Sequence, residues 1–199
     1  SVPILILGAS MENDIEDIIN FDITPNVFSY DFAKAISYMA EKKEKVTKIH
    51  IKLDTGMSRI GYVVSDNNDE IIDEIVKISK LPYIEIEGIF SHFSTSDEYD
   101  DSYTRLQFKR FMSVTNALKE RGVDIPIKHI CNSAGIMMYP EMHLDMVRPG
   151  VILYGMYPSD EVDKTRLDLI PAMSLKSKIT YVKEVESGRG VSYGKEYIT

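Results

Sequence analysis

The stretch Val46–Gly61, VTKIHIKLDTGMSRIG, decides the fold class of this protein. Within it, polar and apolar side chains alternate at period two over Val46–Leu53, and several of them are β-branched, a pattern typical of a β-strand. The residues from Asp54 to Gly61 are polar and rich in glycine, which predicts a loop. A polar cluster directly after a strand is the arrangement of parallel α/β proteins, whose functional groups come from the carboxyl ends of strands.

Strand-like and helix-like runs alternate on both sides of this stretch, along almost the whole chain. We expect further strands at Val2–Leu7, Thr24–Ser29, Pro82–Ser91, Ile125–Ile130 and Leu144–Tyr154, the first of them buried on both faces. We expect helices at Met11–Asn20, Tyr30–Lys43, Asn67–Lys80 and Asp100–Arg121, with a short helical turn from Ser133. Repeated βα units of this length predict a parallel sheet covered by helices.

The number of strands bears on the architecture. About six strands are fewer than the eight of a (β/α)8 barrel, which typically spans ~250 residues. Residues Met173–Glu186, MSLKSKITYVKEVE, differ in kind, because they alternate as a strand does and no helix follows them. We therefore expect part of a TIM barrel, about six βα units, over residues 1–169 and the start of a second, β-rich domain over residues 170–199.

The charge balance is acidic. The 23 Lys and Arg residues against 31 Asp and Glu residues give a formal net charge of −8, without a basic stripe. This argues against nucleic acid or an anionic membrane as the main partner, and no apolar run approaches the ~18–20 residues of a membrane span. The single cysteine, Cys131, excludes an internal disulfide and is expected to be a small buried hydrophobe. We expect a cytoplasmic protein.

Four polar segments at expected strand ends carry the most specific signal: KLDTGMSRIGY from Lys52, SHFSTSDE from Ser91, NSAG from Asn132 and MVRPGVILYG from Met146. In this order they resemble the alanine racemases, fold-type III enzymes that depend on pyridoxal 5′-phosphate (PLP). The resemblance covers nearly the whole chain, from ILILG near the start to VSYG at Val191–Gly194. It implies a PLP-binding TIM barrel, two-base racemisation of L-alanine to D-alanine for bacterial cell-wall synthesis, and a homodimer.

Arg148 is the most informative of the candidate site residues. The resemblance places it against the pyridine nitrogen of PLP, where most PLP enzymes have a carboxylate. An arginine stays charged and can only donate hydrogen bonds, so it leaves that nitrogen unprotonated and weakens the ring as an electron sink. A less delocalised carbanion suits rapid reprotonation, as a racemase requires, whereas decarboxylases of the same barrel family use a glutamate.

The remaining cofactor-binding candidates follow neighbouring strands. Asn132 and Ser133 open a short helix, where a hydroxyl and free N–H groups form an anion site for the phosphate; a helix cap without a ligand is the alternative for Ser133. Gly150 and Val151 offer backbone N–H groups that can approach the phosphate closely. The resemblance places the His92 imidazole against the cofactor ring, although a purely structural histidine is the commoner case.

Three further residues are expected to position substrate and cofactor. The resemblance implies that Arg59 donates to the phenolic oxygen of PLP and helps to place the substrate carboxylate; a solvated loop arginine is the alternative. It also implies that Lys52 is carbamylated and holds Arg59 as an anion, whereas a lysine that reaches the surface is the alternative. His129 is expected to orient Arg148, with structural packing equally plausible.

Neither racemisation base is expected within these residues, so we assign no catalytic residue here, and we assign no metal site. The resemblance places the Schiff-base lysine before Ser1, in a motif like K-A-N-A-Y-G, and the opposing tyrosine beyond Thr199 on the other subunit; Tyr193 is not that tyrosine. The 199 residues alone are therefore expected to be inactive.

Two rival functions remain open. A serine racemase or a broad-specificity amino-acid racemase would share these motifs. A non-catalytic PLP-carrier barrel protein is a further alternative, and the strand expected at Met173–Glu186 argues against it, because such carriers lack a second β domain.

Overall fold

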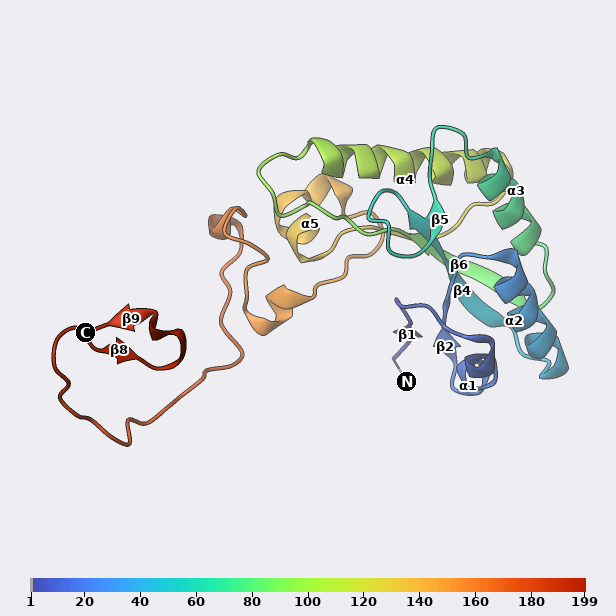
Figure 1. Ribbon diagram of the computed structural model, residues 1–199. Helices are drawn as coiled ribbons and strands as arrows, with labels where there is room; N and C mark the ends of the chain where they lie inside the picture. The colour runs from blue at the N-terminus through green and yellow to red at the C-terminus, as the bar shows by residue number, and fades with distance from the viewer. Residues whose placement is uncertain (1) are drawn as a thin grey trace.

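A parallel sheet with helices α2, α3 and α4 along one face forms the body of the computed structural model, which describes residues 2–199 (Figure 1). The strands are β1 (Ile4–Leu5), β2 (Ile23–Thr24), β3 (Asn26–Val27), β4 (Thr47–Asp54), β5 (Tyr62–Val63), β6 (Ile84–Phe90) and β7 (Ile127–His129). The helices are α1 (Ile15–Asn20), α2 (Tyr30–Lys42), α3 (Asp69–Ile78), α4 (Ser102–Glu120) and α5 (Ser133–Met138). These bounds confirm the α/β fold class and the main helices expected from the sequence.

The sheet has the strand order β3-β4-β6-β7, all parallel, with β5 beside the end of β4. Because side chains alternate along a strand, Ile49, Ile51 and Leu53 of β4 point to the helices and are fully buried. Lys48, His50 and Lys52 point to the opposite face. The two faces of β4 therefore differ sharply in polarity.

A β-bulge interrupts the pairing of β4 with β6. Ile49 pairs with Ile86, but His50 pairs with Gly88, so Glu87 is an extra residue on β6. Beyond the bulge, Ile89 pairs with Ile51 and lies on the helix-covered face. The extra residue thus keeps the apolar side chains of both strands on the same face.

The first expected strand is largely absent. β1 is two residues long, and Val2, Ile4 and Leu7 are exposed, so the expectation of a strand buried on both faces is wrong. β1 pairs with β2 alone among residues 2–199, which leaves its side chains without a covering layer.

The expected strand at Leu144–Tyr154 is also wrong. The N–H of Asp145 donates to the carbonyl of Lys128 and that of Arg148 to the carbonyl of Cys131, both at 3.1 Å, but no ladder develops. Pro149 has no N–H to continue it, and Val151–Tyr154 forms a short 3-10 helix instead. Arg148 therefore lies on irregular backbone beside β7.

The expected strand at Met173–Glu186 is wrong as well. This segment is exposed and irregular, because no neighbouring strand within the described residues takes up its N–H and C=O groups. Only a small antiparallel hairpin, β8 (Gly190–Val191) with β9 (Tyr197–Ile198), follows it, apart from the α/β body (Figure 1). The barrel is not closed, and the domain boundary near residue 170 stays a prediction. No helix within residues 2–199 has both the length and the apolar character of a membrane span.

Candidate functional site

The loops after β6 and β7 and the segment around Arg148 enclose a cavity of about 400 Å³. All six residues expected to bind the cofactor line it, together with five others. The lining residues are Leu7, His92, Asp97, Asn132, Ser133, Ala134, Arg148, Pro149, Gly150, Val151 and Pro158. The structure thus brings together residues that lie far apart in the sequence, as expected for strand ends that meet at one edge of a parallel sheet.

Arg148 is anchored through both of its terminal nitrogens. Nη1 lies 2.5 Å from Nδ1 of His129, and Nη2 donates to the carbonyl of Ser91 at 2.7 Å and to that of Ile130 at 3.2 Å. Nη2 also lies 3.2 Å from Nδ1 of His92. The Nε–H group is buried and meets no hydrogen-bond acceptor in the part of the chain described. One strong donor is therefore left over beside the cavity.

Burial shapes the charge of this cluster. It lowers the pKa of Arg148 to about 10, which leaves the guanidinium charged at neutral pH. Burial and the charge of Arg148 lower the pKa of His92 to about 4 and that of His129 to about 2, so both imidazoles are neutral. His129 and Arg148 are in contact, and the orienting role of His129 stays a prediction.

Ser133 and Asn132 have separate roles at the start of α5. Asn132 is the helix cap, because its Oδ1 accepts from the N–H of Gly135 at 2.9 Å. Ser133 Oγ instead accepts from the N–H of Gly150 at 2.8 Å, which joins α5 to the loop after Arg148. The alternative of Ser133 as the helix cap is therefore wrong.

Lys52 points into the sheet interior and is only 4 % exposed, so the alternative of a surface lysine is wrong. Its Nζ donates to the carbonyl of Leu53 at 2.8 Å. Burial, together with the charges of Arg148 and Arg59, lowers the pKa of Lys52 to about 7, against an opposing effect of Asp54. This places a largely uncharged amine in the interior above that pH.

Arg59 is exposed on the loop after β4, and no hydrogen bond joins it to Lys52 among the residues described. The loop is held by Asp54, whose Oδ1 accepts from the N–H groups of Gly56, Met57 and Ser58, each at 3.0 Å. The expected pairing of Lys52 with Arg59 and the carbamylation of Lys52 stay predictions.

Sequence reasoning missed Gln107, a fully buried residue on the inner face of α4. Its Oε1 accepts from the N–H of Ser94 at 2.9 Å, and its Nε2 donates to the carbonyl of His92 at 3.1 Å and to Oγ1 of Thr55 at 3.4 Å. Gln107 therefore joins the loops after β4 and β6. Its place among the apolar positions of α4 is the signal that could have identified it.

Cys131 is buried, and its thiol donates to the carbonyl of Met142 at 3.2 Å. Burial raises the pKa of this thiol to about 12, which keeps it protonated. Cys131 therefore packs as the small buried side chain expected from the sequence.

The sequence and the fold are similar to those of known proteins. Residues 1–158 match the family model described as the alanine racemase N-terminal domain. The chain belongs to this family. An alanine racemase from Clostridium tetani is 53 % identical over 197 residues, which are 99 % of this chain and 50 % of that protein. The chain spans about half the length of the curated relatives it matches.

Solved structures of the family share the fold. An alanine racemase of Clostridium difficile 630 superposes with a TM-score of 0.88 at 46 % identity, over 100 % of this chain and 51 % of that one. A histidine racemase from Leuconostoc mesenteroides subsp. sake has a TM-score of 0.81 at 27 % identity, over 98 % of this chain and 51 % of that one. The same fold is thus present in racemases named for different amino acids.

Proposed function

We propose that the cavity binds PLP and that the protein is an alanine racemase, which interconverts L- and D-alanine with two bases. The observation that carries this proposal is the buried Nε–H of Arg148, which has no acceptor within residues 2–199. An unprotonated pyridine nitrogen is an acceptor that would satisfy it. The relatives named alanine racemase support the choice of reaction.

The residues around the cavity fit the two ends of this cofactor. Arg148 would hold the pyridine nitrogen, and the N–H of Val151 with the hydroxyl of Ser133 would hold the phosphate. The N–H of Gly150 donates to Ser133 Oγ at 2.8 Å in this structure and would exchange that acceptor for a phosphate oxygen. His92 and Asn132 would complete the wall. When bound, PLP supplies an electron sink for the charge that remains when the α-proton of an amino acid leaves.

The chain's own residues then control charge at the ring. Arg148 remains protonated near neutral pH, so it donates a hydrogen bond and no proton. The neutral imidazoles of His92 and His129 accept hydrogen bonds from it without adding positive charge. This limits delocalisation into the ring, which favours return of the α-proton over side reactions.

Arg59 is proposed to receive the substrate carboxylate. Its charge lowers the pKa values of Lys52, His92 and Arg148, so it acts on the site from its exposed loop. Neither a lysine nor a tyrosine is among the residues that line the cavity. Through the resemblance, the proposal includes a lysine and a tyrosine base supplied from outside residues 2–199, the tyrosine by a partner subunit of a homodimer.

Substrate choice has a second candidate. The histidine racemase from Leuconostoc mesenteroides subsp. sake has the same fold, so the barrel alone does not select alanine. A serine or broad-specificity racemase therefore stays an alternative. Through the resemblance, the proposal also includes a role of D-alanine in cell-wall synthesis and a cytoplasmic location.

The test compares variants of the whole protein in PLP binding and in racemisation of alanine, serine and histidine. Arg148→Glu should protonate the pyridine nitrogen, shift the absorption of bound PLP and slow alanine racemisation by at least about a hundredfold. Arg105→Gln is the matched control, because Arg105 pairs with Asp101 on the exposed face of α4. An unchanged spectrum and rate in Arg148→Glu would refute the assigned contact between Arg148 and the pyridine nitrogen. Faster racemisation of serine or histidine than of alanine by the wild type would refute alanine as the substrate.

A further inference from the structure

A row of polar side chains runs along the sheet face opposite α2, α3 and α4 and ends at Arg148. Lys48 Nζ donates to Glu87 Oε1 at 2.5 Å, and Glu87 Oε2 lies 3.5 Å from His50 Nε2. His50 Nδ1 lies 2.9 Å from His129 Nε2, and His129 Nδ1 lies 2.5 Å from Arg148 Nη1. We call these five residues the interior row.

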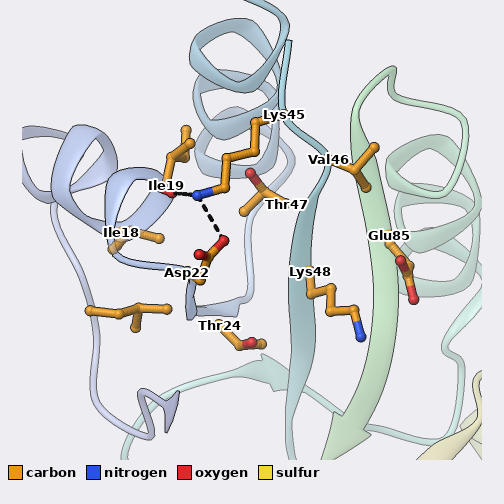
Figure 2. Close-up of a pocket in the computed structure, with 10 residues that line it drawn as sticks. Ile18, Ile19, Asp22, Thr24, Lys45, Val46, Thr47, Lys48 and Glu85 are labelled. Carbon is orange, nitrogen blue, oxygen red and sulfur yellow. Dashed lines mark hydrogen bonds and ion pairs between the residues drawn. The ribbon is translucent and has the colours of Figure 1, made fainter. Parts of the chain in front are cut away.

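The interior row begins at solvent. A second cavity, of about 260 Å³, opens between the amino ends of β2, β4 and β6, and Lys48 and Glu85 lie along its edge (Figure 2). The side chain of Lys48 is 51 % exposed, that of Glu87 21 % and that of His50 4 %. The row therefore passes from the surface into the buried interior within three residues.

Hydrogen-bond chemistry gives the interior row one direction. Arg148 has only donors, so Nδ1 of His129 must accept and its proton must be on Nε2. That Nε2–H then donates to Nδ1 of His50, which places the proton of His50 on Nε2, facing the carboxylate of Glu87. A protonated His50 would present an N–H to the N–H of His129, and burial lowers its pKa against the opposing effect of Glu87.

The backbone makes room for His50 at the bulge. A Cβ at Gly88 would clash with the imidazole of His50, so only glycine leaves the ring its place. The extra residue of the bulge, Glu87, contacts both His50 and Lys48. Phe90 stacks on His129 with a centroid distance of 4.7 Å and an interplanar angle of 2°, which fixes that ring as well.

We propose that His50 and Glu87 are positioning residues that fix the tautomer of His129 and thereby hold Arg148 with its Nε–H free for an acceptor in the cavity. This rests on the proposed function only in naming PLP as the source of that acceptor. If His129 carried its proton on Nδ1, two N–H groups would face each other at Arg148, and the guanidinium would have to turn.

The first test reads the tautomers directly in the 15N-labelled whole protein without cofactor. The nitrogen NMR signals of His50 and His129 should show neutral rings with the proton on Nε2 in both. Glu87→Leu removes the acceptor and should move part of the proton of His50 to Nδ1, whereas Glu87→Gln keeps an acceptor oxygen and the wild-type pattern. A His129 with its proton on Nδ1 in the wild type, or no change in Glu87→Leu, would overturn the proposal.

The second test measures PLP affinity in the whole protein. Glu87→Leu should weaken PLP binding by roughly 10-fold to 100-fold, and Glu87→Gln should restore most of it. Glu85→Gln is the matched control, because Glu85 is an exposed carboxylate on the same strand and should leave binding unchanged. If Glu87→Leu does not fold, His50→Leu against His50→Asn replaces it, since asparagine keeps an acceptor near the position of Nδ1.

The two proposals fail in different ways. A wild-type protein that binds no PLP refutes the proposed function, while the tautomers of the interior row are still read in the first test. Tight PLP binding that is equal in Glu87→Leu and in the wild type refutes the positioning role and leaves the proposed function standing.

Discussion

Replacement of Lys52 by methionine should change how the stability of the chain depends on pH. Lys52 is 4 % exposed, and its pKa is lowered from 10.5 to about 7. A pKa lowered this far corresponds to a cost of about 5 kcal/mol for burying the charged form. The unfolded chain binds more protons between the two pKa values, so the stability of the wild type should rise with pH through that window and the Lys52→Met variant should lack this rise.

The size of the effect follows from the same two pKa values. Between about pH 7 and about pH 9 the free energy of unfolding of the wild type should gain about 2 kcal/mol relative to Lys52→Met. The measurement is urea unfolding of both chains, followed by circular dichroism in buffers free of CO2. Lys109→Met, on the exposed face of α4, is the control and should run parallel to the wild type. Parallel curves for the wild type and Lys52→Met would refute the assignment of a buried, easily neutralised amine.

The Lys52→Met variant also tests the predicted carbamylation. A neutral Lys52 amine can add CO2 to form a carbamate with release of one proton, which converts an uncharged group into an anion near Arg148 and Arg59. Labelled bicarbonate should therefore give a carbamate carbon signal in NMR of the wild type that is missing in Lys52→Met. A signal of equal intensity in both would assign the carbamate to another amine.

Two further predictions concern the loops of the site. Asp54→Ala should destabilise the chain by about 1–2 kcal/mol and raise KM for alanine more than it lowers kcat in the whole protein, because three N–H groups of the Arg59 loop lose their acceptor. Asp54→Asn keeps an acceptor oxygen and should restore most of the stability and of the KM. An unchanged KM in Asp54→Ala would contradict this role of Asp54. Gln107→Leu should lower the free energy of unfolding in urea by about 2–3 kcal/mol, because it leaves buried hydrogen-bonding partners on two loops unpaired. A decrease below about 0.5 kcal/mol would show that water replaces the hydrogen bonds of Gln107.

Local patterns in the sequence were enough for α2, α4, β4 and β6, because each element has an apolar stripe of its own period. They failed at Leu144–Tyr154, where the outcome depends on pairing with a distant strand. The apolar residues there were not enough to form a strand, because Pro149 cannot donate to a ladder.

The residues that line the cavity were predicted better than the buried polar residues behind them. Motifs at strand ends identified all six cofactor-binding candidates that line it. The motifs gave no sign of His50, Glu87 or Gln107, because an unpaired polar residue in a sequence looks the same as one whose partner is supplied by a distant element. Their burial and contacts arise only from the tertiary arrangement.

The bulge in β6 has a consequence for the gene as well as for the sheet. Loss of the single codon for Glu87 would remove the extra residue, so Gly88, Ile89 and Phe90 would keep their partners His50, Ile51 and Lys52 in a regular ladder. Ile89 would still face the helices and Phe90 the polar interior, and the backbone would reach Ser91 and His92 with its present orientation, but the interior row would lose the carboxylate of Glu87. An in-frame deletion of three nucleotides at Glu87 should thus spare the sheet, and any length variation of this strand among functional relatives is expected at the bulge.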